Sequence, residues 1–352
     1  VAIINPLHKG MISLITNFTS AIESLAKVHR LLPWLIAYVL LLFLPNLITA
    51  TFGEYYVDLA NRCCLFILLA VGLNIVKGFC GQVTVGHIGL YAIGAVTSAL
   101  LAQNYGLPFW LSAPLAILVT CFAGLVVGLP SVRLEGAYLA LATLGLGESV
   151  RIMIAVTPAL GSSTGIMMIP APTIGDYVIE SFDHYFYLVM TAAIIGIYFS
   201  FVILNSSTGR AFKAIREDVI AASVSGINVP FYKLLAFVIS AIYAGLAGAL
   251  FAHMPPGYLH HNNFTVIEMV TLLLMVVLGG IGNIWGGVVG AIVVTIIYDQ
   301  TKDYYFYQPL IFGITMVFLV VFMPRGIGGV IEQAIVKRKF IEKHEEQNLG
   351  TS

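Results

Sequence analysis

Long apolar stretches separated by short polar segments dominate the chain. A stretch of about 20 apolar residues matches a helix that crosses the hydrocarbon core of a bilayer. Ten stretches follow this pattern: 31–50, 58–77, 85–102, 107–129, 136–156, 185–204, 231–252, 264–281, 284–299 and 307–323. Three of them (85–102, 264–281 and 284–299) are short, and a broken or re-entrant helix is an alternative to a full crossing there. The pattern predicts an all-α, polytopic membrane protein with about ten transmembrane helices.

Residues 1–30, before the first predicted span, show a different pattern. Apolar residues recur there at spacings of three and four: Met11, Ile15, Phe18, Ile22 and Leu25. One apolar stripe on an otherwise polar helix is typical of a segment that lies in the interface against membrane lipid, and packing on a partner subunit is the alternative. Charged residues also occur within 1–30, so we expect no cleavable signal peptide.

The predicted order of domains is an interfacial segment at 1–30, a transmembrane domain at 31–330 and a charged tail at 331–352. Basic residues orient the spans, because Lys and Arg favour the cytoplasmic side. With the N-terminus in the cytoplasm, 14 of the 17 basic residues fall inside, and Arg62, Arg151 and Lys302 fall outside. We therefore expect both termini to be cytoplasmic.

Composition agrees with this interpretation. Hydrophobic residues make up 59% of the chain and charged residues 10%, against roughly 25% charged residues in soluble domains. The formal net charge is zero, which gives no indication of nucleic-acid binding. The four cysteines lie in apolar stretches without metal-ligand spacing, so we expect free thiols, no metal and no cofactor.

The loop at 205–230 is the longest on the predicted cytoplasmic side. Ser207 or Thr208 can cap a helix there, and Gly226 can end it. Apolar residues fall on one face of that helix: Phe212, Ile215, Val219 and Ala222. The pattern predicts a short amphipathic helix that either lies on the headgroups or docks into a groove of a cytoplasmic protein.

At this loop the sequence resembles the permeases of bacterial ATP-binding-cassette importers for branched-chain amino acids. GRAFKAIREDVIAASVSGIN at 209–228 is similar to their cytoplasmic loop, with Ala221, Ala222 and Gly226 matching an Ala-Ala pair followed by Gly. The Glu that directly precedes the alanines in many importers is missing here. Four further stretches resemble the family in order: GQVTVGHIGLYAIGA at 81–95, LEGAYLALATLGLGESVRIMI at 134–154, FTVIEMVTLLLMVVLGGIGNIWGGVVGA at 264–291 and LIFGITMVFLVVFMPRGI near the end. The likeness covers 58–330 and is greatest to the longer of two paired permease subunits.

The resemblance implies partners and a location in the bacterial cytoplasmic (inner) membrane. It implies a second homologous permease subunit, two cytoplasmic ABC ATPase subunits and a periplasmic or lipid-anchored substrate-binding protein. It also implies a coupling segment whose members are Arg210, Phe212, Lys213, Ile215, Arg216, Glu217, Asp218, Ala221, Ala222 and Gly226. The sequence has no G-x-x-x-x-G-K-[ST] phosphate loop, so we expect ATP hydrolysis in the partners and no enzyme activity here.

Two glycine-rich segments, 81–100 and 279–297, occupy corresponding places in two halves of five spans. Because five is odd, such a repeat would be inverted, although common membrane-helix composition explains the same likeness. Broken helices there would offer free backbone groups to a zwitterionic amino acid, and close helix packing is the competing interpretation. The candidate pathway residues are Gly81, Gln82, Thr84, Gly86, His87, Gly279, Gly280, Gly282 and Asn283.

Other polar residues at membrane depth allow two interpretations each. His87 is either proton-linked or a hydrogen-bonded packing residue, and Glu148 and Arg151 are expected to pair at a spacing of three. Glu268, near the outer end of its span, either binds a partner or extends to the interface. Related permeases for urea, amides or other amino acids are alternatives, as is an ion-coupled secondary amino-acid transporter using His87 or Glu148.

Overall fold

The computed structural model describes residues 53–301, 306–322 and 326. Internal contacts divide the chain into units 1–56 and 57–352, and nearly all described residues belong to the second unit. The predicted interfacial segment 1–30, the first predicted span 31–50 and the tail 331–352 lie outside the described residues.

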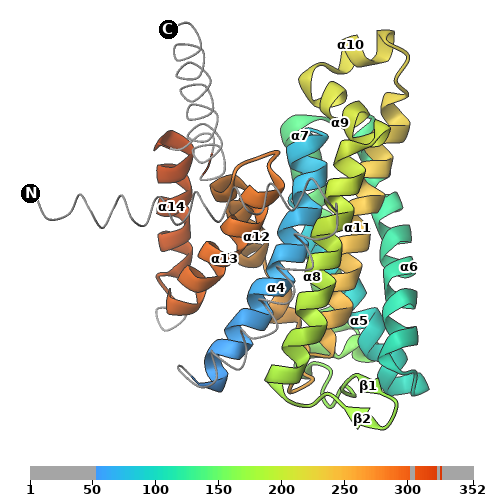
Figure 1. The fold of residues 1–352 in the computed structure, drawn as a ribbon, viewed down its shortest axis with the longest axis vertical. Helices are drawn as coiled ribbons and strands as arrows, with labels where there is room; N and C mark the ends of the chain where they lie inside the picture. The colour runs from blue at the N-terminus through green and yellow to red at the C-terminus, as the bar shows by residue number, and fades with distance from the viewer. Residues whose placement is uncertain (1–52, 302–305, 323–325, 327–352) are drawn as a thin grey trace, which may run out of the picture. The chain divides into compact units, whose positions relative to one another are not determined.

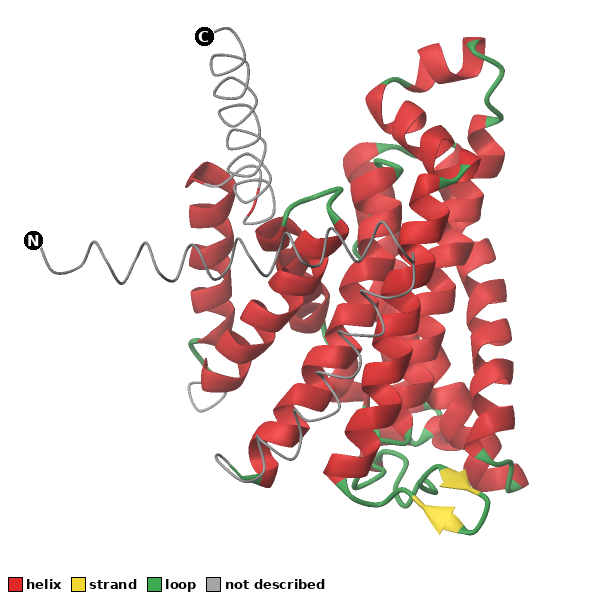
Figure 2. Cartoon of the chain, in the orientation of Figure 1, coloured by secondary structure: helices red, strands yellow, loops and turns green. Residues whose placement is uncertain are grey.

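Helices make up most of the described chain (Figures 1 and 2). They are α4 (Glu54–Asn74), which a π-helical turn (Ile75–Phe79) continues, α5 (His87–Tyr105), α6 (Phe109–Gly128), α7 (Gly136–Val156), α8 (Phe182–Asn205), α9 (Ser207–Glu217), α10 (Val219–Val224), α11 (Val229–Ala252), α12 (Val266–Gly279), α13 (Ile284–Thr301) and α14 (Gln308–Phe322). Short 3-10 turns occupy Leu129–Val132, Pro158–Leu160, Ser162–Thr164 and His261–Phe264. The strands β1 (Thr173–Ile174) and β2 (Tyr177–Val178) form an antiparallel hairpin in which Thr173 faces Val178.

Six of these helices are long and apolar enough to cross a membrane: α4 with its π-helical turn, α6, α7, α8, α11 and α13. The chain is therefore a mostly helical, polytopic membrane protein. α5, α12 and α14 coincide with three further predicted spans. α12 has 14 residues and is about 21 Å long at 1.5 Å per residue, which is less than the roughly 30 Å of a hydrocarbon core. The short stretch 264–281 therefore forms a helix that is shorter than the hydrocarbon core.

The packed core lies where α11 meets α5 and α6. Small residues bring the backbones together: a Cβ at Gly94 would lie 2.7 Å from the Cα of Gly245, and one at Gly248 would overlap the backbone of α5 at Tyr91 and Ala95. Lipid supplies no hydrophobic force between helices, so such close approach supplies much of the attraction.

Hydrogen bonds join buried polar side chains across the same core. Nε2 of His253 lies 3.0 Å from Ser98 Oγ, and Ser200 Oγ lies 2.6 Å from Tyr243 Oη. Unsatisfied polar groups cost several kcal/mol in a hydrocarbon environment, and these pairs avoid that cost.

The two ends of the helical bundle differ in structure. α9 and α10 lie at one end, and the hairpin of β1 and β2 lies at the other (Figure 1). At the hairpin end, Trp110 Nε1 donates to Thr173 O at 2.7 Å. At the α9 end, Lys233 Nζ near the start of α11 lies 2.7 Å from Oε1 of Glu135, the residue directly before α7. The assignment of the α9 end to the cytoplasm stays a prediction from the basic residues.

Candidate functional site

The segment between α8 and α11 folds into two helices where the sequence analysis expected one. Ser206, one position before the predicted caps, accepts a hydrogen bond from Thr208 N at 3.2 Å and begins α9. Asp218 then adopts an extended backbone (φ −157°), and its Oδ1 accepts from Ile220 N at 2.8 Å and Ala221 N at 3.0 Å. An aspartate at this position favours a new N-cap over continuation of the helix, which explains the break.

The apolar face predicted from the spacing is the buried face of this pair. Phe212 and Ile215 are fully buried, Ala222 is buried in α10, and Val219 is half-buried. Phe212 meets Tyr232 of α11 edge-on, with ring centroids 6.2 Å apart. Gly226 has a left-handed backbone (φ +84°) and ends the pair as expected.

The opposite face combines charge with exposed apolar side chains. Ile220 is 75% exposed and Val224 is 83% exposed. The predicted coupling residues that are exposed in this segment are Arg210, Lys213, Arg216, Glu217, Asp218, Ala221 and Gly226. A face with both features fits contact with another protein better than contact with water alone. We call it the coupling surface.

Arg216 connects α9 to both glycine-rich segments. One of its guanidinium nitrogens, Nη1, donates to the backbone carbonyl of Gly78. A Cβ at Gly282 would collide with the same guanidinium, and a Cβ at Gly81 would lie 3.2 Å from the Arg216 Cα. Both glycines have positive φ angles, +83° and +75°, in a region that favours glycine. The Arg216 side chain therefore lies between two breaks, places where the helical backbone is interrupted: one at Gly81 after α4 and one at Gly282 after α12.

Asn74 holds the two breaks against each other. Its Oδ1 accepts from Gly282 N at 2.9 Å, and its Nδ2 donates to Asn283 O at 2.8 Å. Asn283 Oδ1 in turn accepts from Gly286 N at 3.1 Å, at the start of α13. The end of α4 and the second glycine-rich segment, 208 residues apart in the sequence at Asn74 and Gly282, thus meet in the structure.

The other candidate pathway residues take part in packing. A Cβ at Gly86 would overlap the Thr143 carbonyl, and a Cβ at Gly279 would overlap the carbonyl of Gly286. His87 Nδ1 lies 3.0 Å from Ser240 Oγ. The remaining members have backbone roles or are buried: Gly280 N bonds to Val276 O at 3.1 Å, and Gln82 and Thr84 are buried. A role for these residues in the pathway stays a prediction.

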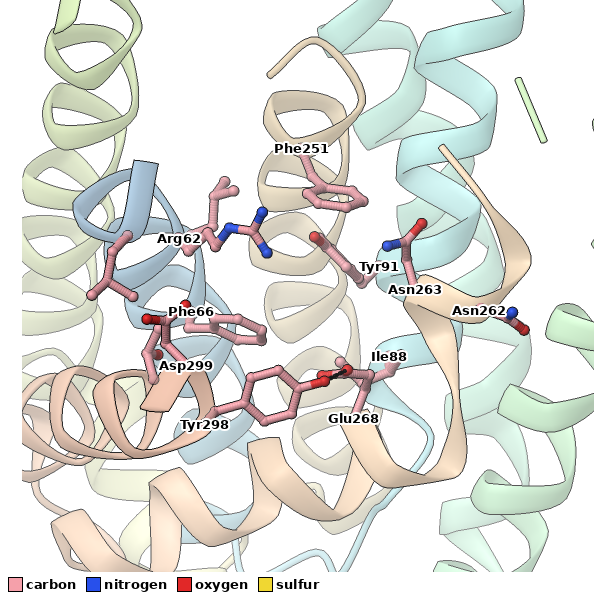
Figure 3. A pocket seen from close by; sticks show the side chains of 13 residues that line it. Arg62, Phe66, Ile88, Tyr91, Phe251, Asn262, Asn263, Glu268, Tyr298 and Asp299 are labelled. Atoms are coloured by element: carbon pink, nitrogen blue, oxygen red, sulfur yellow. Dashed lines mark hydrogen bonds between the residues drawn. The ribbon is translucent and has the colours of Figure 1, made fainter. Parts of the chain in front are cut away.

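A cavity of about 250 Å³ lies between α4, α5, α11, α12 and α13 (Figure 3). Arg62, one of its lining residues, lies in the first half of α4, the half nearer the hairpin end of the bundle (Figure 1). The polar lining residues of the cavity are Arg62, Asn262, Asn263, Glu268, Thr295, Tyr298 and Asp299. Its apolar and aromatic lining includes Leu65, Phe66, Ile88, Tyr91 and Phe251.

Hydrogen bonds hold the charged side chains of this cavity. Arg62 Nε donates to Asp58 Oδ2, one turn earlier on α4, at 3.0 Å. Tyr298 Oη donates to Glu268 Oε1 at 2.6 Å. The sequence analysis noted Glu268 but missed Arg62 and Asp299 as candidates. Each is a charged residue within a predicted span (58–77 and 284–299), and such a charge is itself a signal of function.

Glu148 and Arg151 form the expected ion pair on α7. Both side chains are about one quarter exposed, and neither lines the cavity. Each of these two residues therefore already has a charged partner within α7.

A model of one protein family, described as the permease component of branched-chain amino acid transport systems, matches residues 55–323. The chain is 37% identical over 297 residues to the high-affinity branched-chain amino acid transport system permease protein LivM of Salmonella typhimurium, covering 77% of this chain and 69% of that protein. It is 25% identical over 285 residues to LivH of the same organism, covering 75% and 91%.

A more distant similarity extends to a sugar transporter. The galactofuranose transporter permease protein YtfT of Escherichia coli is 25% identical over 290 residues, covering 75% of this chain and 80% of that protein. No solved structure matches the chain at a significant level.

Proposed function

The chain belongs to the family of branched-chain amino acid transport system permeases, and from this premise we propose that it is a permease subunit of an ATP-driven importer for leucine, isoleucine and valine. In this proposal it forms the translocation pathway with a second, homologous permease in the bacterial inner membrane. Two cytoplasmic ATPases and a substrate-binding protein complete the transporter. The chain itself crosses the membrane about ten times, with both termini in the cytoplasm.

The coupling surface is the observation that carries this proposal. α9 and α10 lie at the end of the bundle, bury one apolar face and leave Ile220 and Val224 exposed beside charged side chains. An ATPase that docks there contacts a helix that is already joined to the membrane domain through Arg216 and Gly78. Movement of the ATPase thus has a direct route into the bundle.

The experiment is uptake of labelled leucine by cells with and without this chain, with ATP kept high while the proton and sodium gradients are collapsed. Uptake that requires the chain and survives the collapse supports the proposal. Uptake that disappears with the gradients indicates an ion-coupled transporter instead. A chain-dependent uptake of urea or amides, without leucine, would keep the class of transporter and change the substrate.

A further inference from the structure

Charged side chains from three helices converge on the cavity shown in Figure 3. Arg62 comes from α4, Glu268 from α12 and Asp299 from α13. The first lies more than 200 residues from the other two in the sequence. Charged groups within membrane segments are costly, and they normally face a partner, water or a transported solute. Convergence of both signs of charge on one cavity points to a solute that carries both signs.

The basic part of the cavity is oriented for a carboxylate. The bond from Arg62 Nε to Asp58 fixes the guanidinium against the preceding turn of α4. Figure 3 shows its terminal nitrogens directed into the cavity, on the side of the Tyr91 hydroxyl. A guanidinium offers donors in a planar fork that matches the two oxygens of a carboxylate.

The acidic part of the cavity is suited to an ammonium group. Glu268 is held in place by the Tyr298 hydroxyl at 2.6 Å, and Asp299 follows Tyr298 directly on α13. An ammonium group has three N–H donors, and carboxylate oxygens accept them in charge-assisted hydrogen bonds. A neutral solute such as urea would use neither the guanidinium nor the carboxylates as charges.

The remaining wall is apolar, and the space is small. Phe66 of α4, Ile88 of α5 and Phe251 of α11 supply aromatic and aliphatic surface. At roughly 30 Å³ for each water molecule, the volume of about 250 Å³ holds about eight waters. That space suits one small solute of about nine bonded heavy atoms, the size of leucine, and not a disaccharide.

We propose that this cavity binds an amino acid in its zwitterionic form. Its carboxylate lies on Arg62, its ammonium group faces Glu268 and Asp299, and its aliphatic side chain packs on the apolar wall. The inference rests on the proposed function, since it names the place where the transported amino acid is held. The cavity lies toward the end opposite the coupling surface, where substrate from the binding protein would enter.

The test uses the complete transporter in proteoliposomes, with ATP at the ATPases and labelled leucine on the binding protein. Arg62→Gln and Glu268→Gln are compared with Arg151→Gln, a matched control that removes a guanidinium outside the cavity. For both cavity variants we expect the leucine imported per ATP hydrolysed to fall about tenfold or more, the size of a charge-assisted hydrogen bond. ATP hydrolysis stimulated by the binding protein stays near the wild-type rate, and Arg151→Gln imports leucine normally.

Two outcomes separate the proposals. If the wild type imports leucine and both cavity variants import as much per ATP, the cavity assignment is overturned while the proposed function stands. If the wild type imports no leucine with ATP, the proposed function fails, and the amino-acid ligand fails with it. Co-purification with the partner subunits identifies any variant that does not assemble. Arg62→Lys, which keeps the charge without the planar fork, then replaces it and is expected to retain only part of the transport.

Discussion

Removing the Arg216 side chain tests how the coupling surface reaches the membrane domain. Arg216→Ala deletes the charge-assisted hydrogen bond to the Gly78 carbonyl, a bond of the class that contributes about 1.5–3 kcal/mol. Arg216 is an exposed residue, so water can replace part of this interaction and the lower range of about 1–2 kcal/mol applies. Because every 1.4 kcal/mol corresponds to a factor of ten, we expect coupling to fall about five- to thirtyfold.

The assay measures ATP hydrolysis and leucine import in the same proteoliposomes. We expect Arg216→Ala to hydrolyse ATP and to retain its ATPase subunits while importing less leucine per ATP, with Arg216→Lys between it and the wild type. Arg210→Ala is the control, because Arg210 is exposed on the same helix. If Arg216 served only as a docking charge, both alanine variants would lose ATPase binding and hydrolysis together. An unchanged ratio of import to hydrolysis in Arg216→Ala would refute the link through Gly78.

Three further perturbations have expected outcomes that thermal unfolding of the purified transporter can check. Gly279→Ala places a Cβ against the Gly286 carbonyl and should destabilise the folded protein by about 1–3 kcal/mol. Its control is Gly145→Ala, which meets open space and should leave the melting temperature unchanged or slightly raised. Equal melting temperatures for the two variants would contradict the packing interpretation. Asn74→Ala loses two hydrogen bonds between helices and should cost about 1–3 kcal/mol, and a loss well under that range would show that the two breaks hold together without it. Burial lowers the pKa of His253, which lies just beyond the end of α11, so its neutral form is favoured in the folded state. The stability it contributes is complete above its unfolded pKa of about 6.5 and is lost as the pH falls through that value toward the folded one. His253→Gln should therefore melt with a smaller difference between pH 7.5 and pH 5.5, and an unchanged difference would assign the effect to another group.

The helical plan was predictable because lipid forces apolar residues onto the outside of each span. The stretch 136–156 was predicted with the bounds that α7 has, and 231–252 differs from α11 by two residues at its start. The break between α9 and α10 was missed because the apolar spacing of three and four continues through Val219. Asp218 carried the opposing signal, since aspartate is a preferred N-cap residue.

The cavity was not predictable in the same way. Its wall depends on α4 lying beside α12 and α13, and no local pattern near Arg62 specifies that contact. The glycine-rich segments were recognised as unusual, but their composition does not separate close packing from a binding role. No local pattern assigns a role to Asn74, because its partners at Gly282 and Asn283 lie about 200 residues away in the sequence and are brought to it by the fold.

The pairing of Ser98 with His253 has a consequence for the time course of synthesis. The two residues are 155 positions apart, which a ribosome working at about 5–20 residues per second covers in about 8–31 s. During that interval Ser98 has one neighbour, Ser112 Oγ of α6 at 3.2 Å, while its second partner, His253, has not been made. α5 is also outside the group of described helices that are apolar and long enough to cross a membrane. The group of Ser98, Ser112 and His253 is therefore completed only when the end of α11 has been made, so that a late helix returns to two early ones.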